Sequence, residues 1–228
     1  MIKVTIPEKR LVLSYSNRVT EKVTVKVTDR VTEDERISIC IYESVVIAII
    51  YFTGDQHFGH ANIIKHCNRP FDTVSEMDEY LLAEWNNRVT TNDTVYILGD
   101  LFFRNAVSAS DYLCKLHGKK HLIKGNHDKD WMKKTNLEKH FQSVSNMIEF
   151  SDGSHKITLC HYPLMTWNGI AKGSYHIHGH IHNNVDAAYF QLLKSMPNAL
   201  NAGVDINHFR PVTFAELVKN NQEFKDGN

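Results

Sequence analysis

The sequence predicts an α/β fold in which two β-sheets pack face to face, with helices on their outer sides. Between residues 51 and 124, apolar strand-like runs alternate with runs of helical period, which is typical of a parallel α/β arrangement. Beyond this half the pattern is more antiparallel, because strand-like runs at 144–150 and 156–161 flank Asp152-Gly153, a strong hairpin signal. A sandwich of two sheets fits both halves.

The individual elements follow from their periodicity and end signals. The apolar run 45–52 indicates a buried strand. Ser75 and Asp78 resemble a helix capping box, and Thr213 with Glu216 resembles a cap for a short final helix. The other expected elements are strands at 95–98, 121–124, 174–178 and 200–204, and a helix at 107–117 that Gly118 ends.

Residues 1–44 differ in composition from the rest of the chain. They are rich in Val, Thr, Lys and Glu, and Arg-Val-Thr-Glu occurs at 18–21 and again at 30–33. This segment could be a hairpin added to a sheet edge, a dimerisation arm or a poorly ordered extension. We expect residues 45–228 to form the functional domain, and the role of residues 1–44 stays open.

Composition narrows the functional classes. The 228 residues are 42% hydrophobic, enough for one full core, and the formal net charge is zero. Stable binding of duplex nucleic acid is disfavoured, because it usually requires a basic footprint. The four cysteines form no CxxC pair and fit reduced thiols in the cytoplasm. The apolar run 45–52 is too short for a membrane span.

Five short runs of metal-ligand residues occur in order along the chain. They are Asp55-Gln56-His57, Gly99-Asp100, Gly125-Asn126-His127-Asp128, His161 and Gly179-His180-Ile181-His182. Each of the first four follows an apolar stretch that reads as a strand, so the ligands should gather at strand ends, where open α/β sheets place their sites.

The residue types fit a site for two divalent ions. Such a site needs a carboxylate able to bridge the ions, neutral imidazoles and open positions for water. Aspartates, one asparagine and several histidines supply this mixture. Cysteine is absent from all five runs, which argues against a structural zinc site of the thiolate type.

The ordered pattern D-x-H, GD, GNH[DE], a lone His and GHxH resembles the calcineurin-like metallophosphoesterase family, over residues 51–212. The resemblance implies a four-layer αββα architecture of two mixed sheets flanked by helices. It also implies that the first metal is held by Asp55, His57, Asp100 and His182, and the second by Asp100, Asn126, His161 and His180.

The same resemblance implies a reaction, the hydrolysis of a phosphodiester or phosphomonoester by a hydroxide that bridges the two metals. His127 would protonate the leaving oxygen or stabilise the developing charge, and Asp128 would orient its ring. Manganese is the expected metal, with iron, nickel or zinc as alternatives. The expected partner is a small phosphoester or nucleotide, and the oligomeric state is open.

Three further residues are candidates for substrate contact. His60 follows His57 closely enough to enter the same pocket, and Arg69 lies in a loop-like segment where a lid over the site would be placed. Arg104 stands near Phe103, a position where many members of the resembled family carry an acid. Each of the three could instead be an ordinary surface or packing residue.

Two other classes remain open from sequence alone. The chain could be a catalytically silent metal-binding scaffold or a partner-recruiting module of the same fold. It could also hold a single metal ion on two histidines and one carboxylate, although this would leave the Asn126 and His161 runs unexplained. The number of bound metal ions discriminates between one-metal and two-metal sites.

Overall fold

The structure is a computed structural model, and it describes residues 48–104 and 108–227. The predicted extension 1–44 and the first residues of the expected strand 45–52 lie outside the described residues. Within the described part, the chain forms two mixed sheets, of five and four strands.

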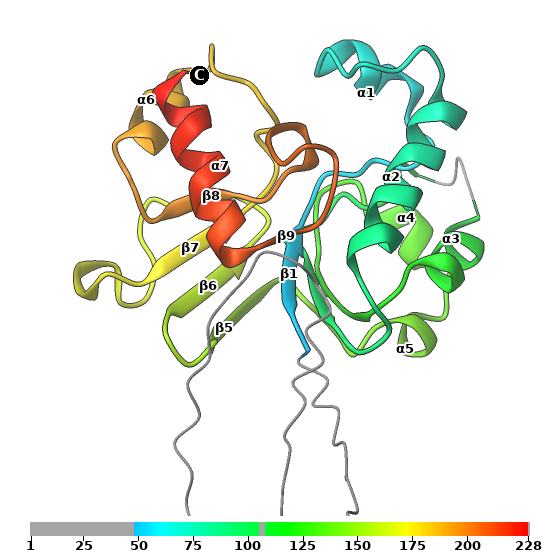
Figure 1. The fold of residues 1–228 in the computed structure, drawn as a ribbon, viewed down its shortest axis with the longest axis horizontal. Coiled ribbons are helices and arrows are strands. Elements are labelled where there is room, and N and C mark those ends of the chain that lie inside the picture. Colours follow the sequence, from blue (N-terminus) through cyan, green and yellow to red (C-terminus); the bar gives the residue numbers. More distant parts are fainter. Residues whose placement is uncertain (1–47, 105–107, 228) are drawn as a thin grey trace, which may run out of the picture. The chain divides into compact units, whose positions relative to one another are not determined.

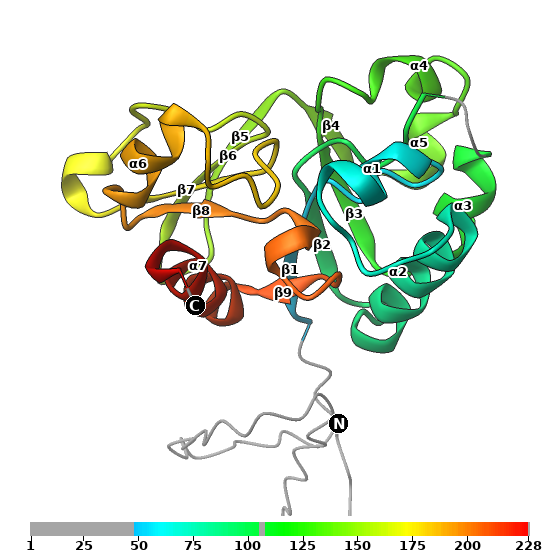
Figure 2. The ribbon, with the colours of Figure 1, turned by 90° about the horizontal axis from the view of Figure 1, so that it is seen from above.

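The first sheet has the strand order β4-β3-β2-β1-β9 (Figure 2). Its strands are β1 (Ile50–Thr53), β2 (Thr94–Ile97), β3 (Lys119–Ile123), β4 (Ser143–Ser145) and β9 (Val212–Thr213). Strands β1 to β4 are parallel, and β9 pairs antiparallel with β1. The turns after β1, β2 and β3 therefore leave the sheet at the same edge.

The second sheet has the order β5-β6-β7-β8. Its strands are β5 (Met147–Ser151), β6 (Lys156–Cys160), β7 (Tyr175–His178) and β8 (Ala199–Asn201). The expected hairpin at Asp152-Gly153 joins β5 to β6, and these two strands are antiparallel. The remaining pairs, β6 with β7 and β7 with β8, are parallel, which corrects the more antiparallel arrangement expected for this half.

One expected strand is divided between the two sheets. The run 144–150 forms β4 and β5, with the exposed Asn146 between them. Because β4 pairs with β3 and β5 pairs with β6, the chain crosses from the first sheet to the second at this point.

Helices flank the two sheets (Figure 1). Beside the first sheet lie α1 (Ala61–His66), α2 (Val74–Arg88), α3 (Ala109–Lys115), α4 (Lys129–Met132) and α5 (Leu137–His140), and α6 (Ala188–Lys194) lies with the second. Helix α7 (Phe214–Asp226) contacts β8 of the second sheet and β1 and β9 of the first. Two 3₁₀ turns, η1 (Ile170–Lys172) and η2 (Val204–Ile206), complete the elements. Within the described ranges, no helix combines the length and apolar character needed to cross a bilayer.

Of the two helix caps predicted from the sequence, the cap of α7 is confirmed and the cap of α2 is wrong. Thr213 and Glu216 form a capping box at the start of α7, which runs for 13 residues and is not short. The cap of α2 is Thr73, whose side chain accepts a hydrogen bond from the backbone of Glu76. The expected Ser75 instead lies inside α2.

Three apolar clusters define the layers. Alternation along β1 sends Tyr51 into a cluster with α2 and α3, and Phe52 into a second cluster between the sheets. The second cluster includes Leu159 and Ile177 from the second sheet. A third cluster joins Leu193 of α6 to the outer side of the second sheet. The predicted α/β sandwich of two mixed sheets with flanking helices is confirmed.

Candidate metal centre

The turns that follow parallel strands of both sheets meet at one place and bring metal-ligand side chains together. Within the described ranges three groups form, and within each group one ligand atom per residue lies within 4.8 Å of the others; the third, Cys67, His182 and Asp205, shares His182 with the first. The first group is Asp55, His57 and His182, and the second is Asp100, His161 and His180. All six residues belong to the runs singled out in the sequence.

Asp100 lies between the first and second groups. Its Oδ2 atom is 3.6 Å from His57 Nε2 in the first group and 3.6 Å from His161 Nε2 in the second. Asn126 joins the second group, because its Oδ1 atom lies 3.1 Å from His161 Nε2. The position of Asp100 is the one that a bridging ligand would need.

The hydrogen bonds of His161 show that its surroundings suit a cation. Its Nδ1 lies 2.6 Å from the carbonyl oxygen of Leu98, and this oxygen can only accept, so Nδ1 carries the proton. In the neutral ring, Nε2 then presents a lone pair toward Asn126 Oδ1 and Asp100 Oδ2. Three electron-rich atoms that converge in this way match the donor set of a divalent metal ion.

The first group also suits a cation, because several of its buried polar atoms lack hydrogen-bond partners among the described residues. In the part of the chain that the structure describes, Asp55 Oδ1 and both ring nitrogens of His57 are buried and have no hydrogen-bond partner. Buried polar atoms normally find a partner, and a missing ion is one accepted explanation for an orphan. Burial lowers the pKa of His57 well below its ordinary value, so the ring is neutral, as a metal ligand must be.

The electrostatic environment around His182 favours positive charge. Burial opposes protonation, but the hydrogen bond to Asp205 and the nearby Asp55 raise the pKa of His182 to about 11. His182 Nδ1 lies 2.8 Å from Asp205 Oδ2, so this nitrogen carries a proton and Nε2 is the atom available for a ligand bond. The same surroundings would stabilise a bound cation.

Left-handed backbone conformations gather at the candidate ligand residues. Five of them have left-handed φ values between 51° and 72°, namely Asp55, His57, Asp100, His180 and His182. Such a conformation costs a non-glycine residue about 1–3 kcal/mol and occurs chiefly where function requires it. All five residues lie in the turns that follow β1, β2 and β7.

Glycines allow these turns to approach one another. A Cβ atom on Gly179 would lie 2.6 Å from Asp55 Oδ2, and one on Gly99 would lie 2.6 Å from His161 Nδ1. A Cβ atom on Gly125 would overlap the carboxylate of Asp100. These positions therefore require glycine, because a side chain there would clash with Asp55, Asp100 or His161 of the candidate centre.

Asp128 is fully buried and holds the turns in register. Its Oδ2 accepts hydrogen bonds from the backbone N–H groups of Asp100 and Gly125, at 2.9 and 2.7 Å. Its Oδ1 accepts from the backbone of Leu101 and from the indole of Trp131, at 3.0 and 2.9 Å. These contacts occupy both oxygens of Asp128. The sequence had predicted that Asp128 would orient the His127 ring, and none of the four contacts is to that ring.

Arg69 also differs from its expected role. It is 4% exposed, and its guanidinium forms a bidentate ion pair with Asp205 and donates to the backbone oxygens of Asp55 and Gln56. These contacts fix the first turn from behind, so Arg69 is not a lid residue that faces a phosphate. Its donors are already used inside the protein.

The remaining predicted residues differ in burial: His60 is buried, His127 is half-buried and Arg104 is exposed. His127 is half-buried, with its ring centroid 5.2 Å from that of His57 and 6.3 Å from that of His60. His60 stacks on Phe103 at 3.6 Å, and burial lowers the pKa of His60 to about 4. Arg104 is exposed, with its guanidinium 5.1 Å from the Phe103 ring.

Sequence reasoning missed two carboxylates behind the site. Asp205 orients His182 and pairs with Arg69, and although burial opposes it, Arg69 lowers the pKa of Asp205. Asp78, read as part of a cap, accepts from the backbone of Gly59 with both oxygens. In the sequence, Asp205 is recognisable only as an acidic residue that follows the expected strand 200–204. Its pairing with Arg69, which is distant in the sequence, cannot be predicted from that position.

The fold and the site define a class of protein, an αββα sandwich with His, Asp and Asn ligands on the turns where both sheets meet. A comparison with family models finds no match. Over 173 residues the chain is 36% identical to the uncharacterized protein MJ1445 of Methanocaldococcus jannaschii, covering 75% of this chain and 89% of that protein. The chain belongs to the family of that protein.

Two other similarities accompany it. The Gene 66 protein of Mycobacterium phage L5 is 28% identical over 160 residues, which cover 58% of this chain and 77% of that protein. The crystal structure of the protein of unknown function AQ665 from Aquifex aeolicus matches with a TM-score of 0.60 and 26% identity, covering 76% of this chain and 99% of that one. These names state no activity, so a function must be argued from the site.

Proposed function

We propose that the protein is a metal-dependent phosphoesterase that uses two divalent ions to hydrolyse a phosphodiester or phosphomonoester. The observation that carries the proposal is the pair of three-ligand groups that meet at Asp100. Asp55, His57, Asp100 and His182 would hold one ion, and Asp100, Asn126, His161 and His180 the other. The ions would supply Lewis acidity, which activates water and neutralises charge on the phosphoryl oxygens.

His127 is the residue we assign to proton transfer. It is half-buried, and its backbone N–H donates to Asp100 Oδ1 at 2.8 Å, which ties its position to the central carboxylate. A histidine placed there can protonate the leaving oxygen or stabilise charge on the equatorial oxygens. His60, adjacent to it, is a candidate for contact with a phosphoryl oxygen.

Asp128, Asp205 and Arg69 act as positioning residues. Asp128 joins the Asp100 turn to the Gly125 turn, and Arg69 with Asp205 joins the Asp55 turn to His182. Catalytic groups must be held close to their productive geometry, so these buried contacts support the proposal by making the site rigid.

The test is hydrolysis of a chromogenic phosphodiester and its monoester by protein stripped of metal and reloaded with manganese. Oxygen and imidazole ligands suit manganese, and the same assay extends to iron, nickel and zinc. We expect two ions per chain. His127→Ala should lower kcat by about 10²–10⁴-fold with both ions retained, Asp100→Ala should lose metal and turnover together, and His155→Ala serves as a control at the opposite end of β6.

The outcomes separate the alternatives. One ion per chain would indicate the mononuclear site. Two ions without hydrolysis of either ester would favour the silent scaffold, and full activity of His127→Ala would contradict the assignment of the acid.

A further inference from the structure

A groove of about 500 Å³ adjoins the metal centre on the side of Asn126. Its wall includes Gly125, whose turn leads directly to that ligand. Three lysines, Lys124, Lys129 and Lys133, line it together with the apolar Met132 and Leu137. Its volume lies within the roughly 300–1,000 Å³ that is usual for small-ligand pockets.

The groove concentrates positive charge on a chain whose formal net charge is zero. In the described part of the protein, none of these three lysines lies within 4.0 Å of a carboxylate oxygen. The neighbouring carboxylate of Asp128 is buried and accepts four hydrogen bonds elsewhere. The ammonium groups are therefore available to an anionic ligand.

Tyr162 stands between the groove and the metal centre. It lines the groove and is 45% exposed, so part of its ring is open to a ligand. Its ring centroid lies 5.0 Å from that of His161 and 4.8 Å from that of His180, both in edge contacts. Packing against two proposed metal ligands fixes the ring next to the reaction site.

We propose that this groove binds the nucleotides next to the cleaved phosphodiester of a single-stranded nucleic acid, an inference that rests on the proposed phosphoesterase function. The lysines would contact backbone phosphates, Tyr162 would stack on a base, and Met132 with Leu137 would contact the apolar faces of base and sugar. Cations along a groove combined with an exposed aromatic ring are the features by which proteins bind single strands.

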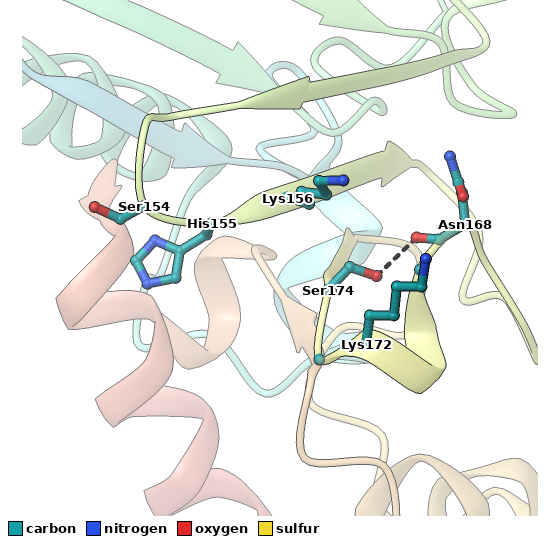
Figure 3. Close-up of a pocket in the computed structure, with 8 residues that line it drawn as sticks. Ser154, His155, Lys156, Asn168, Lys172 and Ser174 are labelled. Carbon is teal, nitrogen blue, oxygen red and sulfur yellow. Dashed lines mark hydrogen bonds between the residues drawn. The ribbon is translucent and has the colours of Figure 1, made fainter.

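A second cavity supplies the matched control. It has a volume of about 390 Å³ and is lined by Lys156, Lys172 and Ser174, among others (Figure 3). Lys156 begins β6, whereas His161 follows the end of that strand, so this cavity lies at the opposite end of the second sheet. Its lysines match the charge of the groove lysines but not their position.

The experiment compares Lys129→Ala/Lys133→Ala with Lys156→Ala/Lys172→Ala in the full chain. One readout is the ratio of kcat/KM for a short oligothymidylate to kcat/KM for the chromogenic diester, with manganese present. The other is fluorescence anisotropy of the labelled oligonucleotide between about 50 and 200 mM salt. We expect the groove pair to lower the ratio at least about tenfold and to reduce the salt slope by about 1.4, near 0.7 for each lost single-strand contact.

Tyr162 is tested with a conservative variant. Tyr162→Ala should weaken oligonucleotide binding by about 5- to 100-fold, and Tyr162→Phe should bind like the wild type, because stacking requires the ring alone. Equal losses in both variants would argue against stacking.

The two proposals fail in different ways. If the diester is hydrolysed and the groove pair leaves both the ratio and the binding unchanged, the groove inference is wrong and the phosphoesterase stands. If the wild type hydrolyses neither the diester nor the monoester, the proposed function fails, and the anisotropy series still decides whether the groove binds single strands. Binding of a duplex as tight as that of the single strand would overturn the inference.

Discussion

Asp128 shows how one buried carboxylate can organise a site without touching substrate. It accepts four N–H hydrogen bonds, from the backbones of Asp100, Leu101 and Gly125 and from the Trp131 indole. Burial raises the pKa of Asp128. All four of its partners are hydrogen-bond donors, however, and they favour the ionised carboxylate, which can only accept hydrogen bonds. The order of the turns depends on this one side chain.

Replacing Asp128 by Asn should therefore be costly. The amide would direct an NH₂ group toward two N–H donors, so we expect Asp128→Asn to lower the free energy of unfolding by about 2–4 kcal/mol and to weaken metal binding. Urea unfolding and metal analysis after dialysis measure both effects. Asp130→Asn, an exposed change on α4, should leave both near the wild type. A stable Asp128→Asn protein with impaired turnover alone would instead support the expected contact with His127.

The sequence identified the residues that gather at the candidate metal centre but not the buried residues that support them. The ligand runs were recognisable because each combines a turn signal with a metal-binding residue type, and both are local properties. Arg69 and Asp205 are separated by 136 residues, so nothing local distinguishes their ion pair from two surface charges. Arg69 was accordingly expected on a lid, whereas the fold buries it behind the site.

At the scale of elements, the turn after β7 determines how closely the second sheet approaches Asp55. Gly179 carries no side chain where a Cβ atom would lie 2.6 Å from Asp55 Oδ2 and 3.0 Å from the Leu98 carbonyl oxygen. The backbone N–H of His180 then donates to Asp55 Oδ2 at 2.9 Å. This contact joins a turn of the second sheet to a ligand of the first.

Gly179→Ala should displace Asp55, because the new methyl group would lie 2.6 Å from Asp55 Oδ2 and also only 3.0 Å from the Leu98 backbone oxygen. We expect at least an about tenfold loss of affinity for one metal ion, since a shift of a ligand by a few tenths of an ångström is felt in a packed site. Isothermal titration with manganese measures it. Gly153 lies in the β5–β6 turn with φ +97°, and no atom of the described residues lies within 4 Å of an added Cβ, so Gly153→Ala should lose about 1–2 kcal/mol of stability and no metal affinity. Wild-type affinity in Gly179→Ala would show that the turn tolerates a side chain.

Local signals predicted elements well where the deciding contacts are also local. The β5–β6 hairpin and the Thr213 cap of α7 were predicted because a tight turn and a capping box are each set by a few neighbouring residues. The parallel pairing of β6, β7 and β8 was missed, since the partner of a strand is chosen by long connections and by burial. The division of run 144–150 at Asn146 has the same cause.

At the scale of the whole molecule, both sheets contribute to the proposed metal centre. The turns of the first sheet carry Asp55, His57, Asp100 and Asn126, and those of the second carry His161, His180 and His182. Metal ions held by both sets would link the two sheets. Binding to the folded chain alone adds about 2.7 kcal/mol per site at 100 times the dissociation constant.

Manganese should therefore raise the melting temperature. For a domain of this size, one such site corresponds to roughly 5–10 °C, and two sites to more. Circular dichroism melts with chelator and with manganese measure the shift, and Asp100→Asn should lose most of it. A melting temperature that does not respond to manganese would count against resident metals, whatever the esterase assay gives.

The left-handed backbone at the five candidate ligand residues has a consequence for how the sequence changes during evolution. Glycine or asparagine would adopt those φ values more easily than histidine or aspartate, so a chain under selection for folding alone would drift toward them at Asp55, His57, Asp100, His180 and His182. A histidine or aspartate that persists in such a turn is retained against that drift. If these residues hold metal as we propose, relatives of this chain with glycines at the same positions should have lost metal binding.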